Sequence, residues 1–274
     1  MSGNGLINII MKSIPKPLIQ LNILLNIICY ISLFAGIYYG SLVDCAYILL
    51  VYFFLGMTEQ AFYHRMYSHR SWNCPDWMKC VGLHVASLTL LAPILQWVAV
   101  HRKHHRNTDN PDDPHSPVYK SRFDIQFKSS FFNVDYSYAT DLMKDRIAMF
   151  YTYMYLPVIF VSWSLLIYVM GIEKFCLIWL AGTGLVILMA NGINAWHHGK
   201  KVWFGQYQLH TDGRTGTSKN DMILGYLHFD GWHNNHHYNG KKYYYGEKYW
   251  EIDITGIYIW LLATITGYNK QLHK

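Results

Sequence analysis

The chain is poor in charged residues, in paired cysteines and in the motifs of common redox cofactors. Only 15% of its 274 residues are Asp, Glu, Lys or Arg, against roughly 25% in ordinary soluble domains, whereas 52% are apolar and 17% aromatic. Its five cysteines form no CxxC pair, so neither a disulfide framework nor a cysteine-held metal cluster is indicated. The sequence also lacks a haem-binding domain, a flavin fingerprint and a ferredoxin-like cysteine motif. A bilayer is therefore the first solvent to consider, and electrons for any redox reaction must come from a separate protein.

Four apolar stretches are long enough to cross a hydrocarbon core of about 30 Å, which takes roughly 20 helical residues. They cover residues 18–39, 44–63, 147–170 and 175–196. The first is longer than a signal-peptide core, so we expect a span there. A fifth stretch, 80–100, is free of acidic and basic residues but holds His84, Pro93 and Gln96. We expect it to lie along the membrane or dip into it, and a shorter run near 254–265 suits the interface.

The basic residues are distributed unevenly around these stretches. Two lysines precede the first span, eleven Lys and Arg lie within residues 64–146 and nine follow residue 199, whereas the turns between paired spans hold only Lys174. The N-terminus and the regions 64–146 and 197–274 are therefore predicted to lie on the cytosolic side. We predict one all-α integral membrane domain, residues 1–274, with four transmembrane helices in two hairpins and a cytosolic helical cap. The net charge of +6 then points to a membrane surface and not to nucleic acid.

Eight of the fifteen histidines gather in three short motifs. These are HRMYSH (His64, His69), HRKHH (His101, His104, His105) and HNNHH (His233, His236, His237). In the HxxHH motifs all three rings fall on one helix face, so they can point at a single locus. The five-residue step of HRMYSH turns an α-helix by about 500°, so its rings diverge by about 140° unless the helix ends or distorts. They could serve different ions, or one ion at a helix end. Eight imidazoles exceed the capacity of one six-coordinate ion, which favours two metal ions.

The chemistry of imidazole sites narrows the choice of metal. Hydrolytic zinc usually uses three protein ligands and a water, often in HExxH, which this sequence lacks. Imidazole also suits iron, and a pair of iron ions can reduce dioxygen to an oxidant that breaks an unactivated C–H bond. Acyl chains offer such bonds at a membrane. We therefore predict a di-iron oxidase. A non-enzymatic metal transporter is the rival from another class, but apart from Glu59 and a few Asn the spans lack the polar residues that a transit path needs.

These three histidine motifs, called the first, second and third box below, occur in the same order in the membrane fatty acyl desaturases. They resemble those of the stearoyl-CoA desaturase family and its bacterial relatives. Further landmarks are WVAVHRKHHRNTD, DDPHSP, TSKN, FDGWHNNHH and KYWEIDI, so the resemblance covers about residues 18–266. It implies four spanning helices, a cytosolic cap, a buried bent acyl tunnel and two irons held by histidines of all three boxes. It also implies an external electron donor, a cytochrome b5-like or ferredoxin-like protein. All eight box histidines carry over as ligands.

The family adds a ninth histidine at the end of the fourth span, four residues after an asparagine that contacts the site through water. In MANGINAWHHGKK, Asn194 and His198 keep this spacing. In the alternative alignment, Asn191 matches the asparagine of the family's Asn-Gly-Ile motif. The position of the ninth histidine is then occupied by Ala195. The resemblance therefore assigns Asn194 and His198, with His197 as the alternative ligand.

Several polar residues near the boxes could hydrogen-bond to the imidazoles and orient them. The loop after the second box holds Asp109, Asp112, Asp113 and His115, of which we select Asp109, Asp112 and His115. The alternative is a capped, solvated loop. Asp230 precedes the third box. Glu59 lies near His64, where the family is usually less polar, and either tunes the first box or makes an interior hydrogen bond.

The predicted activity is O2-dependent desaturation of a fatty acyl chain, with an acyl hydroxylase or acetylenase of the same superfamily as the alternative. The acyl group could be carried on CoA, another thioester or a lipid. The membrane would be the endoplasmic reticulum in a eukaryote or the cytoplasmic membrane in a bacterium.

Overall fold

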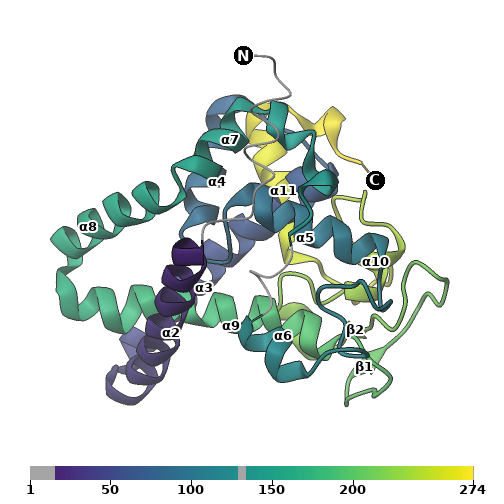
Figure 1. Cartoon of the computed structure of the whole chain (residues 1–274), viewed down its shortest axis with the longest axis horizontal. Coiled ribbons are helices and arrows are strands. Elements are labelled where there is room, and N and C mark those ends of the chain that lie inside the picture. Colours follow the sequence, from purple (N-terminus) through teal and green to yellow (C-terminus); the bar gives the residue numbers. More distant parts are fainter. Residues whose placement is uncertain (1–15, 129–133, 274) are drawn as a thin grey trace.

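The computed structural model describes residues 16–128 and 134–273, and this part of the chain is mostly helical (Figure 1). It opens with two long helices, α2 (Lys16–Tyr39) and α3 (Leu42–Glu59). At the turn between them, the side chain of Ser41 accepts a hydrogen bond from the backbone N–H of Asp44, and the Asp44 carboxylate accepts one from the backbone N–H of Ser41. This capping box satisfies N–H groups that the first turn of α3 leaves unpaired, and so it stabilises the turn.

A second pair of helices lies within the apolar stretch from Tyr155 to Trp196. It consists of α8 (Tyr155–Lys174), a π-helical segment η4 (Phe175–Leu180) and α9 (Ala181–Trp196). Gly171 interrupts the stretch with a φ of 79°, a left-handed conformation that glycine adopts without steric cost. Figure 1 shows α8 and α9 leaving this bend in different directions. Lys174 Nζ lies 2.9 Å from Asp44 Oδ1, so the bend and the α2–α3 turn lie side by side.

Three helical stretches of the described residues are apolar and long enough to cross a bilayer: 20–39, 42–68 and 155–196. Together with the helical fold, they indicate a membrane protein, as predicted. The division of the 42-residue third stretch into two spans stays a prediction.

One predicted boundary is wrong. The stretch 147–170 was expected to be one span, but residues Arg146–Tyr153 form a separate helix, α7. The Asp145 side chain caps α7 by accepting hydrogen bonds from the backbone N–H groups of Ile147 and Ala148. The next helix begins only at Tyr155, with Pro157 in its first turn, where a missing N–H costs no helical hydrogen bond.

The stretch 80–100 does not form one continuous helix. It is divided between α4 (Asp76–Ser87) and α5 (Ile94–Arg106), each too short to span a bilayer. The buried segment between them includes Leu90, whose φ is 58°, and Pro93, which precedes α5. This agrees with the expectation that the stretch does not cross the membrane.

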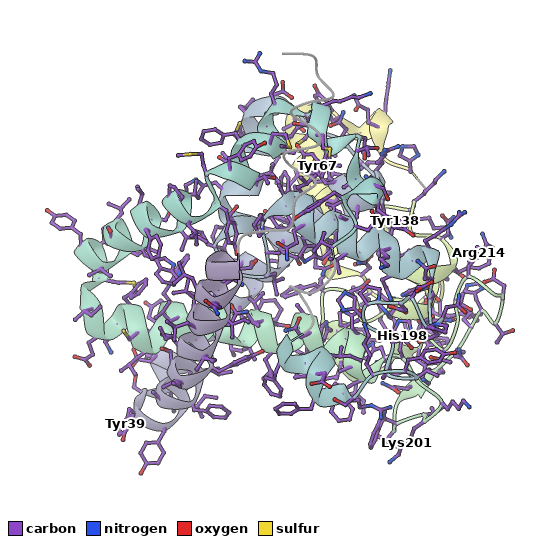
Figure 2. All side chains as sticks on the ribbon, in the orientation of Figure 1. Tyr39, Tyr67, Tyr138, His198, Lys201 and Arg214 are labelled. Atoms are coloured by element: carbon purple, nitrogen blue, oxygen red, sulfur yellow. The ribbon has the colours of Figure 1, made fainter. Side chains whose placement is uncertain are left out.

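The remaining elements are short and surround the histidine motifs. They are η1 (Gln60–Ser68), which continues α3, α6 (Arg122–Lys128), η2 (Tyr136–Ala139), η3 (Leu142–Lys144), β1 (Gln206–Tyr207), β2 (Asn220–Asp221), η5 (Leu224–Tyr226), α10 (His233–Tyr238), α11 (Ile254–Thr266) and η6 (Asn269–Gln271). The two strands pair antiparallel, with Gln206 opposite Asp221. Figure 2 places His198 among these elements and Tyr39 at the far end of α2, so the histidines and the α2–α3 turn lie at opposite ends of the molecule.

Candidate metal centre

Nine imidazoles converge between η1, α5, α10 and the end of α9. Their ring nitrogens form two groups, each with its ligand atoms within 4.8 Å of one another. The first cluster is His64, His69, His101, His105 and His236, and the second cluster is His104, His198, His233 and His237. Within the first cluster the Nε2 atoms of His69 and His101 are 2.8 Å apart, and within the second those of His198 and His233 are 2.9 Å apart. All eight box histidines therefore lie in one of two adjacent clusters.

The π-helical geometry of η1 brings both rings of HRMYSH into the first cluster. The backbone N–H of His69 donates to the carbonyl of His64 at 3.1 Å, an i to i+5 hydrogen bond. In this wider turn, residues five apart lie almost above one another, whereas in an α-helix they would diverge. The two ring centroids are 4.9 Å apart. Of the two arrangements that the sequence left open, the structure shows the rings together, at a distorted helix end.

The prediction that each HxxHH motif directs its three rings at one locus is wrong. Helix α5 places His101 and His105 in the first cluster and His104 in the second, and α10 divides its own three histidines in the same way. At 100° per residue, the i and i+4 side chains are about 40° apart, whereas the i+3 side chain lies about 100° from i+4. The i, i+4 pair therefore shares one cluster, and the i+3 histidine reaches the other.

Three rings of the second cluster contact carboxylates through Nδ1, the ring nitrogen that faces away from the cluster. The Nδ1 atoms of His104, His198 and His233 lie 2.8, 3.1 and 2.7 Å from carboxylate oxygens of Asp113, Asp109 and Asp230, respectively. A ring that donates its Nδ1–H to a carboxylate keeps the lone pair on Nε2, which points into the cluster. Asp109 and Asp230 thus lie where the sequence analysis expected orienting groups.

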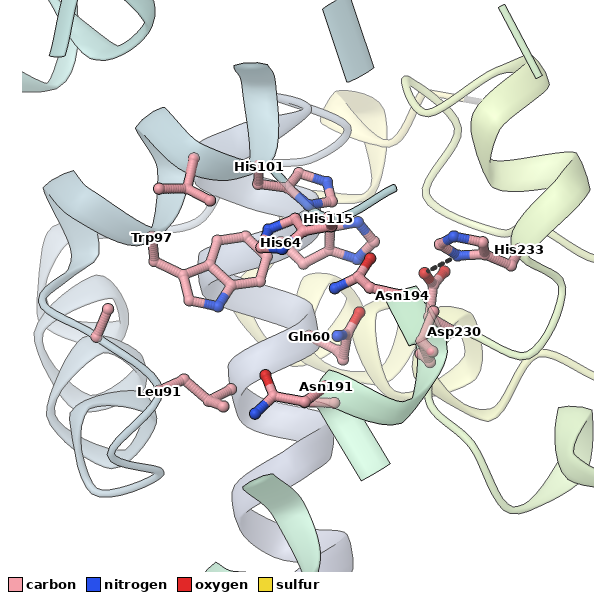
Figure 3. A pocket seen from close by; sticks show the side chains of 14 residues that line it. Gln60, His64, Leu91, Trp97, His101, His115, Asn191, Asn194, Asp230 and His233 are labelled. Atoms are coloured by element: carbon pink, nitrogen blue, oxygen red, sulfur yellow. Dashed lines mark hydrogen bonds and ion pairs between the residues drawn. The ribbon is translucent and has the colours of Figure 1, made fainter. Parts of the chain in front are cut away.

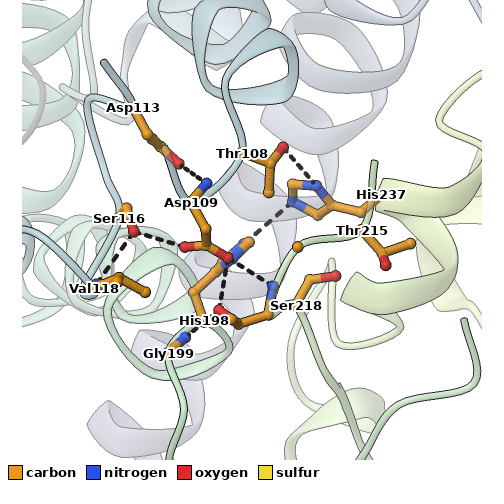
Figure 4. Close-up of polar contacts among 12 residues, drawn as sticks. Thr108, Asp109, Asp113, Ser116, Val118, His198, Gly199, Thr215, Ser218 and His237 are labelled. Carbon is orange, nitrogen blue, oxygen red and sulfur yellow. Dashed lines mark hydrogen bonds and ion pairs between the residues drawn. The ribbon is translucent and has the colours of Figure 1, made fainter. Parts of the chain in front are cut away.

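The selection of Asp112 is not supported, because Asp112 is exposed while Asp113 is fully buried and contacts His104. The loop turns so that Asp113 faces inward: its carboxylate also accepts hydrogen bonds from the backbone N–H groups of Asp109 and His115. Figure 4 shows the polar contacts around Asp109 and Asp113. Asp109 further accepts hydrogen bonds from the backbone N–H and hydroxyl of Thr217. Asp113 and His115 thus belong to the buried part of the loop, whereas its tip, residues 110–112, is exposed.

The other two selected residues lie near the clusters in different ways. His115 is buried, with its ring centroid 5.6 Å from that of His104. Glu59 is also buried, and its side chain is hydrogen-bonded to that of Gln60, while no described hydrogen bond or ion pair joins it to a histidine ring. This geometry favours the interior-contact interpretation of Glu59.

The two adjacent histidines at the end of α9 face different surroundings. His198 belongs to the second cluster, and its Nε2 is 3.2 Å from that of His237. His197 caps α9 and points elsewhere: its Nε2 lies 3.7 Å from Asp221 Oδ2. The geometry places His198, and not His197, among the convergent rings.

A narrow cavity of about 60 Å³ reaches both clusters (Figure 3). Rings of both clusters line it, His64 and His101 from the first and His233 from the second. The rest of the wall combines polar side chains (Gln60, Asn191, Asn194, Asp230) with apolar ones (Leu91, Ala92, Trp97, Ile193). Asn194 thus lines the same cavity as rings of both clusters.

The donor set of the two clusters fits a pair of metal ions. Burial lowers the pKa of His69 to about 3, and it lowers those of His101, His105, His236 and His237 well below the usual value, so these rings are neutral near pH 7. Burial opposes protonation of His104 too, but the Asp113 carboxylate outweighs it and raises that pKa. A neutral imidazole has one N–H and one nitrogen lone pair. Where the Nε2 atoms of several neutral rings face one another, there are too few N–H protons to pair with all of the lone pairs. A cation in each cluster would satisfy them, and nitrogen ligands suit iron, copper or zinc.

Comparison with known proteins identifies the family. The family model described as fatty acid desaturase matches residues 44–246. The chain belongs to the fatty acid desaturase family. The Delta-9 desaturase-like 2 protein of Arabidopsis thaliana is 30% identical over 217 residues, 74% of this chain and 68% of that protein. The sn-1 stearoyl-lipid 9-desaturase of Synechocystis sp. is 28% identical over 226 residues, 77% of this chain and 65% of that protein. The acyl-CoA 5-desaturase AL21 of Anemone leveillei is 29% identical over 229 residues, 77% and 68% of the two chains.

Two asparagines inside the third box of this desaturase family member hold α10 in place. The Asn234 carbonyl oxygen accepts hydrogen bonds from the backbone N–H groups of Leu209 and His210, both at 2.7 Å. Asn235 donates to the Glu251 carboxylate at 2.8 Å. These contacts tie a helix of only six residues to the segments before and after it. The sequence analysis did not select these residues, although both lie in HNNHH and Glu251 lies in the KYWEIDI landmark.

Asp113→Asn is expected to weaken metal binding by roughly 10–100-fold, because an amide holds the His104 ring less firmly in its ligating form than a carboxylate does. The measurement is retained metal per chain during titration with a chelator, on folded protein in detergent. Asp112→Asn is the matched control and should behave like the wild type, since Asp112 is exposed. Equal metal retention in the two variants would contradict an orienting role for Asp113.

Proposed function

We propose that this chain is an O2-dependent fatty acyl desaturase that introduces a double bond at a histidine-held pair of iron ions. The observation that carries the proposal is the arrangement of two histidine clusters on one narrow cavity whose wall is partly apolar. Methylenes of an acyl chain that reached this cavity would lie beside both clusters. Membership in the desaturase family and relatives named as acyl-lipid and acyl-CoA desaturases support the same reaction.

The proposed ligands follow the two clusters. His64, His69, His101, His105 and His236 would hold one iron, and His104, His198, His233 and His237 the other, with Asn194 acting through water. When bound, the iron pair supplies the activation of dioxygen and the removal of two hydrogens from adjacent methylenes. Electrons would come from an external cytochrome b5-like or ferredoxin-like donor.

The chain's own residues fix the ligands and shape the cavity. Asp113, Asp109 and Asp230 keep a proton on Nδ1 of their partner rings, and so hold each Nε2 ready to ligate. Trp97 stacks on His101 with ring centroids 4.9 Å apart and planes 21° apart, which restrains both the ligand and the cavity wall. Leu91 and Ala92 supply apolar surface that orders an acyl chain and excludes water.

For membrane placement, we propose two hairpins, α2–α3 and α8–α9, with the histidine clusters on the cytosolic side. The 2.9 Å ion pair between Lys174 and Asp44 supports this, because it joins the two hairpin turns at one level. The compartment would be the endoplasmic reticulum in a eukaryote or the cytoplasmic membrane in a bacterium.

The activity is tested by expressing the chain in a strain that requires unsaturated fatty acids, and analysing its fatty acids by gas chromatography with mass spectrometry. We expect new double bonds with the wild type and none with His104→Ala, which removes a ligand of the second cluster. His273→Ala is the matched control, since His273 is exposed outside the clusters and should leave the products unchanged. Hydroxylated or alkynyl acids would assign a hydroxylase or acetylenase instead. No product change, with protein and donor verified in the membrane, would contradict the proposal.

A further inference from the structure

An exposed apolar patch lies beside the end of α9, outside the helices that the sequence assigned to the membrane. We define it by Trp203, Phe204, Met222, Ile223 and Leu227. Phe204 is 92% exposed, and Met222 and Leu227 are each 52% exposed. The patch combines two segments, since Ile223 packs against the turn at Gly205 and the backbone N–H of Met222 donates to the Gly205 carbonyl at 2.9 Å. Soluble surfaces rarely gather so many large apolar side chains.

We infer that this patch is immersed in the bilayer and packs against lipid acyl chains, as a re-entrant segment next to the metal centre. The inference goes beyond the proposed reaction and needs no turnover. It rests on the proposed membrane orientation of the two hairpins.

The first argument is the depth at which the segment contacts the apolar helices. The hydroxyl of Tyr52 in α3 donates to the carbonyl of Leu227 at 2.9 Å, and Nε2 of His228 bonds the carbonyl of Met189 in α9 at 2.8 Å. The ion pair of Asp44 and Lys174 marks the level of both hairpin turns. Measured along the helices at 1.5 Å per residue, Tyr52 lies at most about 12 Å from that level and Met189 at most about 22 Å, since tilt only shortens the depth. Both depths fall inside a hydrocarbon core of about 30 Å.

The second argument is that much of the backbone of residues 223–228 has hydrogen bonds that lipid would not supply. The N–H groups of Ile223 and Leu224 both donate to Asp221 Oδ1 at 2.8 Å. The N–H groups of Leu227 and His228 both donate to the Leu224 carbonyl. Irregular backbone is tolerated at membrane depth only where its polar groups are satisfied in this way. The side chains of the patch are then free to face hydrocarbon.

The third argument is continuity with the end of a membrane helix. The Gln206 side chain donates to the carbonyl of Trp196, the last residue of α9, at 3.1 Å, and its backbone N–H donates to the carbonyl of Trp203 at 3.0 Å. Lys201 lies 3.9 Å from the centre of the Trp203 ring. A Trp with an adjacent cation is the composition of a membrane–water interface. The turn at Phe204 thus enters the bilayer beside α9.

The test uses single cysteines labelled with an environment-sensitive fluorophore in reconstituted vesicles, after replacement of the five free native cysteines. Phe204→Cys and Leu227→Cys report on the patch. Leu165→Cys, 63% exposed in α8, is the lipid-facing reference, and Arg214→Cys, whose side chain is 68% exposed in the same 197–232 region, is the aqueous reference. We expect both patch probes to match Leu165, with blue-shifted emission, strong quenching by brominated lipid and little quenching by iodide. Patch probes that match Arg214 would overturn the inference.

A second measurement avoids the cysteine replacements. The emission of Trp203 is the difference in fluorescence between the native protein and its Trp203→Phe variant. We expect brominated lipid to quench this emission severalfold more than iodide does. The reverse ratio would contradict immersion, and it would leave the proposed reaction untouched. If Leu165 itself proved water-exposed, the assumed membrane orientation would fall, and the inference with it.

Discussion

His198→Ala is expected to abolish desaturation and to lower the iron content to about half, whereas His197→Ala keeps both near wild type. The reason is geometric: the Nε2 of His198 lies within 3.2 Å of those of His233 and His237, while His197 faces Asp221. Removing a ligand should cost more than the roughly 10–100-fold loss of affinity that follows removal of an orienting partner.

Iron per chain is measured by mass spectrometry of the metal on purified, monodisperse protein, and activity by product analysis in membranes. The adjacent histidines form a matched pair, because both are buried at the same helix end. Loss of iron from His197→Ala with retention in His198→Ala would reverse the assignment. Equal loss of iron from both variants would show that substitutions at the end of α9 disturb the fold and do not remove a specific ligand.

Asp253→Asn is expected to destabilise the protein by about 3–5 kcal/mol, because it leaves the buried Arg65 guanidinium without its counter-charge. Arg65 donates to both oxygens of Asp253, at 2.6 and 2.9 Å, and neither side chain is more than 2% exposed. The Asp253 carboxylate also caps α11 through the backbone N–H of Gly256. The pair therefore ties the first histidine box to the segment that leads into α11.

Thermal unfolding in detergent, followed by fluorescence, measures this effect, and we expect the midpoint to fall by roughly 10 °C or more. Arg70→Met is the matched control, since Arg70 pairs with Asp141 at 2.6 Å but its side chain is 67% exposed. An exposed pair contributes about 1 kcal/mol or less. Equal shifts for the two variants would show that the buried pair has no special role.

The sequence was most informative where a motif lies on regular secondary structure. The spacing of HRKHH and HNNHH identified six ligand candidates that the structure brings together. It did not reveal the division of each motif between two clusters, because that depends on how α5 and α10 face each other. Helical geometry alone separates the i+3 ring from the i, i+4 pair, so this part of the arrangement could have been predicted from the sequence.

Other features depended on local backbone that spacing does not specify. The π-helical hydrogen bond between His69 and His64 decides where the first box points, and sequence alone could not distinguish it from a helix end. Asp112 and Asp113 are neighbours, so only the turn of their loop determines which one reaches His104. The Arg65–Asp253 pair joins residues 188 positions apart, and its only sequence signal was the presence of each partner in a recognisable motif.

The central claim is that the two histidine clusters hold a pair of iron ions. The most direct test is metal analysis of protein purified from iron-supplemented cells, with Mössbauer spectroscopy of an iron-57-loaded sample to identify the environment. We expect about two irons per chain, in two nitrogen-rich sites, with strong loss in His104→Ala and none in His273→Ala. Stoichiometric zinc, or well-folded protein that takes up no iron in its clusters, would contradict the account.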